Sequence, residues 1–185
     1  MDTVKIITVQ RKAVLDKILT DGIYYADTEK YIAEKAPNLL EPYRYLMREY
    51  GYKHFPIFGC QIGYYCEFYG AKCDEKSVLI QLSVPVDEVR LQHYYNWTDL
   101  CFFIEVPREW EQDEYPLEQF FKDTLHQNNI QHPTEDCHVH QVTMERIKKT
   151  WITDTFPVTE KFSELHDGSG GGNILHELYY YKQRI

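Results

Sequence analysis

Polar side chains near the beginning of the chain are the first candidates for chemistry. Thr8, Gln10 and Arg11 stand where a strand rich in β-branched residues gives way to a helical pattern, and the pair Tyr24 and Tyr25 follows that helix. Polar groups at a strand end can orient a nucleotide, and an aromatic face can stack on its base or nicotinamide. The alternative is structural, with Gln10 beside the helix cap and Tyr24 or Tyr25 in the core.

A second candidate is a metal site around Cys137, His138 and His140. Thiolate and imidazole are the ligands that zinc prefers. Neighbours on a strand point to opposite faces, so Cys137 and His138 cannot both ligate from a regular strand, whereas His138 and His140 can. The spacing matches no closed zinc template. We therefore expect no metal, and interpret this stretch as a polar loop with a buried cysteine.

Other catalytic signatures are absent from the sequence. There is no GxSxG elbow and no local cysteine-protease signature. The phosphate-binding pattern GxxxxGK[ST] is also missing, and the glycines of residues 168–172 are not followed by a helix start and a lysine. These glycines indicate a linker instead.

The elements that must position these residues follow from periodicity and turn residues. Early in the chain we predict a strand at 4–9, a helix at 11–20 that stops at Gly22, a helix after Asp27 and Thr28, and a helix at 39–52. Later we predict strands at 57–68, 78–84 with a continuation at 89–91, 100–106 and 155–162, and helices at 117–125 and 144–150. This order indicates an α+β fold with a largely antiparallel sheet and several short helices.

The domain organisation is simple. We expect residues 1–165 to form a single α+β domain, residues 166–172 to form a glycine-rich linker, and residues 173–185 to form a tail that contains ILHELYYY. We expect the tail to be docked on the domain, because an exposed Ile, Leu and three Tyr would be an aggregation hazard. The alternative is that the tail is an interaction peptide.

Composition excludes several classes of protein. The 185 residues suffice for one domain, and an aromatic content of 15% excludes wholesale disorder. No apolar run reaches about 18 residues, so we expect no transmembrane helix. No secretory signal core is visible, and the five cysteines form no CxxC pair. We therefore expect a cytoplasmic protein whose cysteines are reduced and buried.

The net charge of -9 is unevenly distributed. Residues 105–118 hold a run of acidic side chains, which indicates either a solvated surface or a contact for a basic partner. The overall field opposes a phosphate backbone and disfavours sequence-independent binding of nucleic acid.

Four segments carry a resemblance to a known family. The opening IITVQ with VLDKILTDGIYYAD resembles the start of a bacterial family catalogued as domain of unknown function 3841. YKHFPIFGCQ, VLIQLSVPVDEVRLQHYYNW and IKKTWITDTF resemble its aromatic strand, its Val-Pro turn with a following tryptophan, and its closing segment. The chain departs at Ile7 and Val9, where the family often has Trp and Ile, and in its glycine-linked tail. This resemblance implies no particular function.

The element order is also similar to that of ADP-ribosyltransferase-like domains. It combines a strand, a helix ending in Ile-Leu-x-x-Gly and a later strand that runs into Val-Pro. Such domains use NAD and transfer ADP-ribose to a side chain or a base. They need a polar residue on the first strand, an aromatic ring that stacks on nicotinamide, and a late glutamate that stabilises an oxocarbenium-like transition state.

The similarity to ADP-ribosyltransferases implies roles for particular residues. The late glutamate is Glu105 or Glu160, and the first strand lacks the usual His or Arg, since Arg11 stands one place beyond Gln10. The implied catalytic residues are Gln10, Tyr25 and Glu105, and the implied NAD-binding residues are Thr8, Gln10, Arg11, Tyr25 and Tyr64.

Two hypotheses of function follow. The first is an NAD-binding, ADP-ribosyltransferase-like enzyme that acts on a macromolecular target. The second is a non-catalytic interaction module, for example in a defence, stress or phage-associated complex, that uses the acidic run and the tail as its contact surfaces.

Overall fold

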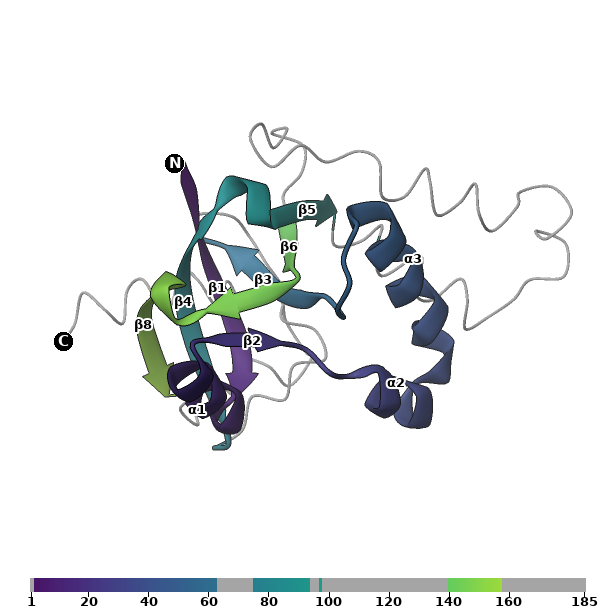
Figure 1. The fold of residues 1–185 in the computed structure, drawn as a ribbon, viewed down its shortest axis with the longest axis horizontal. Coiled ribbons are helices and arrows are strands. Elements are labelled where there is room, and N and C mark those ends of the chain that lie inside the picture. Colours follow the sequence, from purple (N-terminus) through teal and green to yellow (C-terminus); the bar gives the residue numbers. More distant parts are fainter. Residues whose placement is uncertain (1, 63–74, 94–96, 98–139, 158–185) are drawn as a thin grey trace, which may run out of the picture.

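The computed structural model describes residues 2–62, 75–93, 97 and 140–157 (Figure 1). Its strands are β1 (Thr3–Arg11), β2 (Ile23–Tyr25), β3 (Ile57–Gln61), β4 (Ser77–Pro85), β5 (Val89–His93), β6 (His140–Met144), β7 (Arg146–Lys148) and β8 (Ile152–Pro157). Its helices are α1 (Lys12–Asp21), α2 (Glu29–Lys35) and α3 (Leu40–Tyr50), with the 3-10 turns η1 (Pro37–Leu39), η2 (Val86–Glu88) and η3 (Lys149–Trp151).

Six of these strands form one sheet in the order β5-β6-β3-β1-β4-β8, and every neighbouring pair is antiparallel. The longest pairing joins β1 to β4, with Thr3 opposite Pro85 and Arg11 opposite Ser77. Both strands are rich in Val and Ile, which favour a pleated and buried surface. The predicted α+β fold with a largely antiparallel sheet is confirmed.

The main core lies on one face of this sheet. Ile6 of β1 stands opposite Leu82 of β4, and both side chains are fully buried. Ile18 of α1 packs into the same core with Trp151 of η3. Because α1 contacts β1, β2 and β4, it fixes the beginning of the chain against the middle of the sheet.

Helix α1 ends where the sequence predicts. Gly22 has a φ of 80°, in the left-handed region that glycine adopts without a Cβ penalty. Its N–H donates to the Ile18 carbonyl oxygen, which closes the last turn. The end of α1 is also held from a distant segment, because the Lys149 ammonium donates to the Leu19 carbonyl oxygen at 2.9 Å.

Helices α2 and α3 lie together on the right of Figure 1, away from α1. Pro42, Tyr45 and Leu46 are the buried residues of α3. Leu46 and Tyr45 form an aromatic-rich cluster with Trp97, against which Phe58 of β3 packs. The positions of α2 and α3 confirm the helices predicted after Asp27 and at 39–52.

Two predicted elements are wrong. Residues 144–150 were expected to form a helix, but Met144 ends β6 and residues 146–148 form β7, which pairs with β2. Residues 89–91 do not continue the strand at 78–84. They begin β5, which pairs with β6 at the other edge of the sheet. In both cases the segment forms backbone hydrogen bonds with a strand that is distant in the sequence. This long-range pairing overrides the secondary structure that the local sequence pattern predicts.

The remaining predictions fare unevenly. The last predicted strand is β8, which begins at Ile152 rather than at 155. The elements at 100–106 and 117–125, the linker and the tail lie outside the described residues. Cys60 is disulfide-bonded, so the expectation of reduced cysteines is wrong for this residue. No helix in the described part of the chain is long and apolar enough to cross a membrane.

Candidate functional site

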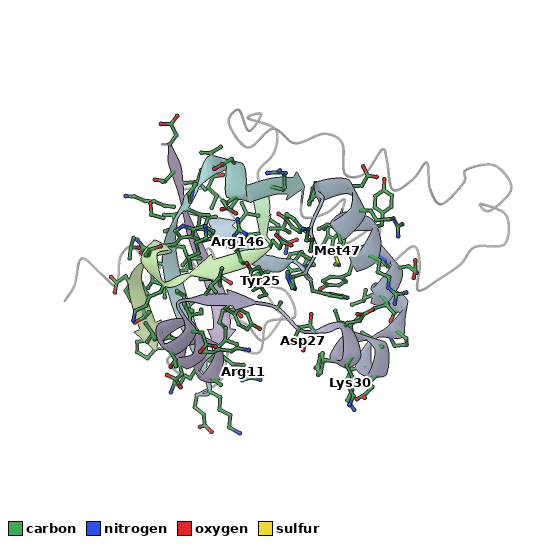
Figure 2. The ribbon with its side chains drawn as sticks, viewed as in Figure 1. Arg11, Tyr25, Asp27, Lys30, Met47 and Arg146 are labelled. Atoms are coloured by element: carbon green, nitrogen blue, oxygen red, sulfur yellow. The ribbon has the colours of Figure 1, made fainter. Side chains whose placement is uncertain are left out.

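The small sheet of β2 and β7 places Tyr25 directly opposite Arg146. Ile147 of β7 is fully buried in the main core, so its neighbours Arg146 and Lys148 both point to the other side of the strand. Figure 2 shows Tyr25 and Arg146 next to each other near the middle of the molecule. A tyrosine from the beginning of the chain thus meets a guanidinium from its later part.

Glu88 of η2 binds both cations of β7. The Arg146 Nη2 donates to the Oε1 and the Oε2 of Glu88 at 2.6 Å each, and the Lys148 Nζ donates to the Oε1 at 3.2 Å. The side chains of Glu88, Arg146 and Lys148 are 21%, 29% and 37% exposed. The carboxylate is therefore held at the edge of the solvent between two positive charges.

Aromatic rings border the ion pairs. The Tyr25 ring lies against His54, with ring centroids 4.3 Å apart. The Lys148 Nζ lies 4.9 Å from the centroid of the Trp151 ring, a cation–π distance. Residues Tyr25, His54, Glu88, Arg146 and Lys148 are called here the Tyr25–Arg146 cluster.

The turn that carries His54 is fixed by a separate carboxylate. The Oε1 of Glu145 accepts hydrogen bonds from the backbone N–H groups of Lys53 at 2.5 Å and His54 at 3.1 Å. The Glu145 carboxylate is thus bound by backbone N–H groups of the turn. A β-bridge between Ala26 and Phe55 ties the same turn to the end of β2.

The electrostatics of the cluster favour charged forms. Hydrogen bonds with Glu88 and Tyr25 raise the pKa of the Arg146 guanidinium above its ordinary value. Burial alone would raise the pKa of the Glu88 carboxyl, but the hydrogen bonds from Arg146 and Lys148 outweigh it and lower that pKa below its ordinary value. The Arg146 Nε is buried and has no hydrogen-bond partner in the described part of the chain.

The strand-end residues predicted as a nucleotide site form a second arrangement. The Gln10 amide donates to the Thr8 hydroxyl at 2.8 Å, and that hydroxyl donates to the Phe58 carbonyl oxygen at 2.7 Å. Thr8 is 0% exposed, so internal groups occupy its hydroxyl. Arg11 donates to the Ser77 hydroxyl at 3.3 Å. The structure therefore brings Thr8 and Gln10 together, with Thr8 buried and Gln10 partly exposed.

Tyr25 does not share this location. Figure 2 shows Arg11 at the lower end of β1 beside α1, whereas Tyr25 lies higher in the view beside Arg146. The other predicted positions, Tyr64, Glu105, Glu160, Cys137 and His138, lie outside the described residues. In the described ranges, no three His, Cys, Asp or Glu side chains are grouped so as to hold a metal ion.

A comparison with protein families gives a match over most of the chain. The family model described as domain of unknown function (DUF3841) matches residues 5–162. The chain belongs to the DUF3841 family. No curated protein and no solved structure matches it. The matched range of this DUF3841 chain contains every member of the Tyr25–Arg146 cluster.

Sequence reasoning proposed a functional role for one member of this cluster in the DUF3841 chain, Tyr25. Arg146, Lys148 and Lys149 form a dense basic group in the sequence, but the helix predicted at 144–150 hid their arrangement. On a strand, residues 146 and 148 share a side, which would have shown two cations close together. His54 and Glu88 gave no signal, because only the folded chain brings the loop before β3 and the turn after β4 to β7.

Proposed function

We propose that this protein binds NAD, or a nucleotide of the same chemistry, at the Tyr25–Arg146 cluster. The observation that supports the proposal is an aromatic side chain, Tyr25, held beside the guanidinium of Arg146. An aromatic ring can stack on a base or a nicotinamide, and Arg with Lys is the usual pair for phosphate oxygens. The cluster offers both kinds of group within one patch at the edge of the solvent.

This placement moves the ligand away from Thr8 and Gln10, which were expected to bind it. The Thr8 hydroxyl already donates to Phe58 and accepts from Gln10. A ligand there would have to break bonds inside the core, whereas Arg146 and Lys148 are only partly buried. We therefore favour Tyr25 as the stacking residue, and keep Gln10 and Arg11 as the competing placement.

The proposed reaction is transfer of ADP-ribose to a macromolecular target. It is supported by the similarity of element order to ADP-ribosyltransferase-like domains. The bond between nicotinamide and the ribose breaks, nicotinamide leaves with the bonding electrons, and a nucleophile of the target forms a bond to the same ribose carbon and loses its proton. Glu105 remains the proposed catalytic carboxylate.

Binding is tested by calorimetric titration of the full chain with NAD and with ADP-ribose. Stacking on a base is worth about 1–3 kcal/mol, so Tyr25→Leu weakens binding by roughly 5- to 150-fold. Tyr25→Phe keeps the ring and should retain most of the affinity. If neither ligand binds the wild-type protein, or if Tyr25→Leu binds as tightly as wild type, the proposal fails.

Transfer is tested separately by release of nicotinamide from NAD in the presence of a cell extract as the source of targets. We expect release above that of a Glu105→Gln variant, together with a labelled macromolecule. NAD binding without release would leave a nucleotide-binding protein and would contradict the transferase.

A further inference from the structure

The Glu88 carboxylate occupies a position that resembles a site for an external anion. One guanidinium nitrogen of Arg146 contacts both of its oxygens at 2.6 Å, and the Lys148 ammonium contacts one of them at 3.2 Å. A phosphate group is recognised by the same combination of a guanidinium and an ammonium. The carboxylate is 21% exposed, so this position can be reached from the solvent.

Contacts with groups besides Glu88 also hold the two cations in place. Arg146 also interacts with the Tyr25 hydroxyl, and Lys148 lies over the Trp151 ring at 4.9 Å. The Nε of Arg146 remains a buried donor with no acceptor in the described residues. Such a donor carries an energetic cost that a better-placed acceptor would remove. The cations are thus positioned to receive an anion with more acceptor oxygens than one carboxylate has.

The side chain of Glu88 can leave this position while its backbone stays in place. Arg90 donates from its Nη1 to the carbonyl oxygens of Asp87 at 3.0 Å and Val89 at 2.9 Å, on either side of Glu88. These bonds fix the backbone of η2. Rotation of a partly exposed side chain is fast and needs no change of fold.

We propose that Arg146 and Lys148 are the phosphate subsite of the nucleotide site, and that Glu88 fills this subsite until a phosphate group of the ligand displaces it. The ligand class is a phosphate ester or diphosphate. The proposal rests on the proposed function, because it places the diphosphate of NAD or ADP-ribose beside Tyr25. Glu88 then acts as an internal competitor that sets how tightly phosphate is held.

The test is calorimetric titration of the full chain with inorganic pyrophosphate, ADP-ribose and adenosine. Glu88→Gln removes the competing charge while keeping the size of the side chain. We expect it to tighten binding of pyrophosphate and ADP-ribose by about tenfold and to leave adenosine binding unchanged. Arg146→Lys should weaken both phosphate ligands.

Glu41→Gln is the matched control, since Glu41 also accepts from an arginine, Arg44 at 3.0 Å, on an exposed part of α3. It should bind all three ligands as the wild type does. Equal or weaker binding of pyrophosphate by Glu88→Gln overturns the proposal, and so does the same tightening in Glu41→Gln.

A spectroscopic measurement on the wild type decides the matter if Glu88→Gln does not fold. The Nε–H resonance of Arg146, assigned with Arg146→Lys, should shift on addition of pyrophosphate, and an unchanged resonance overturns the subsite.

The two proposals fail separately. Binding of NAD that depends on Tyr25 but not on Glu88 contradicts the subsite alone, whereas binding of pyrophosphate that Glu88→Gln tightens, without binding of NAD, contradicts the proposed function alone.

Discussion

Arg146 connects three segments that are far apart in the chain. Its guanidinium bonds Glu88 of η2, its backbone pairs with Tyr25 of β2, and its neighbour Glu145 fixes the turn at His54. The sequence showed the basic residues but not their partners, because the partners come from distant turns. At this scale the sequence allowed Tyr25 to be named as a candidate stacking residue, because it follows a strand and a helix.

Because Glu88 is ion-paired, we expect part of the free energy of unfolding to be lost at acidic pH. The pKa of the Glu88 carboxyl is lowered in the folded protein from its ordinary value of 4.5. A lowered pKa stabilises the fold above that ordinary value, and the contribution disappears as the pH falls through the folded pKa. Glu88→Gln should therefore lose less stability than the wild type when the pH is lowered below 4.5.

The measurement is the urea midpoint of both proteins at neutral pH and at successively lower pH. Glu41→Gln is the control, because an exposed ion pair contributes little to stability. Parallel pH profiles for the wild type and Glu88→Gln would contradict this assignment.

At the scale of elements, the approach of β1 to β3 depends on a glycine. A Cβ built at Gly59 would lie 2.7 Å from the Ile6 Cγ2 and 2.9 Å from the Ile7 carbonyl oxygen. The backbone oxygen cannot move without disturbing the pairing of β1 and β3. Gly59→Ala should lower the free energy of unfolding by about 1–3 kcal/mol, as measured by urea denaturation. A stability equal to that of the wild type would show that the two strands separate easily.

The end of α3 is tied to the sheet by Tyr52. Its hydroxyl donates to the Thr143 carbonyl oxygen of β6 at 3.0 Å. Tyr52→Phe should therefore cost about 1 kcal/mol of unfolding free energy at neutral pH. An unchanged free energy of unfolding in a urea titration would contradict this role.

Because Tyr52 is partly buried, we also expect the free energy of unfolding to fall at alkaline pH. Burial raises the pKa of Tyr52 to about 12, from an ordinary value of 10.0. A raised pKa stabilises the fold fully below the ordinary value, and the contribution is lost as the pH rises from 10.0 towards about 12. Urea midpoints measured across this range should fall less steeply for Tyr52→Phe than for the wild type.

Elements with strong local signals were predicted well. β1, α1 with its stop at Gly22, and β4 lie where their patterns place them. The segment 144–150 was not predicted, since apolar residues at 144 and 147 fit one helix face and also fit two strands separated by a bend. The pairing of Ile147 with Tyr24 and of Met144 with Ile57 decides between them, and both contacts join residues far apart in the chain.

At the scale of the whole molecule, the sequence predicts that the tail at 173–185 belongs to the folded domain. Deletion of residues 167–185 should expose apolar surface, lower the thermal midpoint and promote aggregation. Light scattering and thermal unfolding of the truncated chain are the measurements. A truncated protein that stays soluble with an unchanged midpoint would instead leave the tail free for a partner, as the interaction-module hypothesis requires.

The membership of the DUF3841 family and the α+β class both followed from segments spread along the chain. The location of the proposed nucleotide site did not follow, because stacking and phosphate groups had to be sought in one stretch of sequence. In the folded chain Arg11 at the end of β1 and Tyr25 lie at different places in the view (Figure 2), and the cations come from β7.

The most direct test is the thermal unfolding midpoint of the full chain with and without NAD, repeated on Tyr25→Leu and Gln10→Ala. Ligand at about 100 times its dissociation constant adds about 2.7 kcal/mol, which is roughly 5–10 °C for a chain of this size. We predict a shift of this order in the wild type and in Gln10→Ala, and a clearly smaller shift in Tyr25→Leu. No shift in the wild type at millimolar NAD, or a shift that only Gln10→Ala abolishes, would contradict nucleotide binding at the Tyr25–Arg146 cluster.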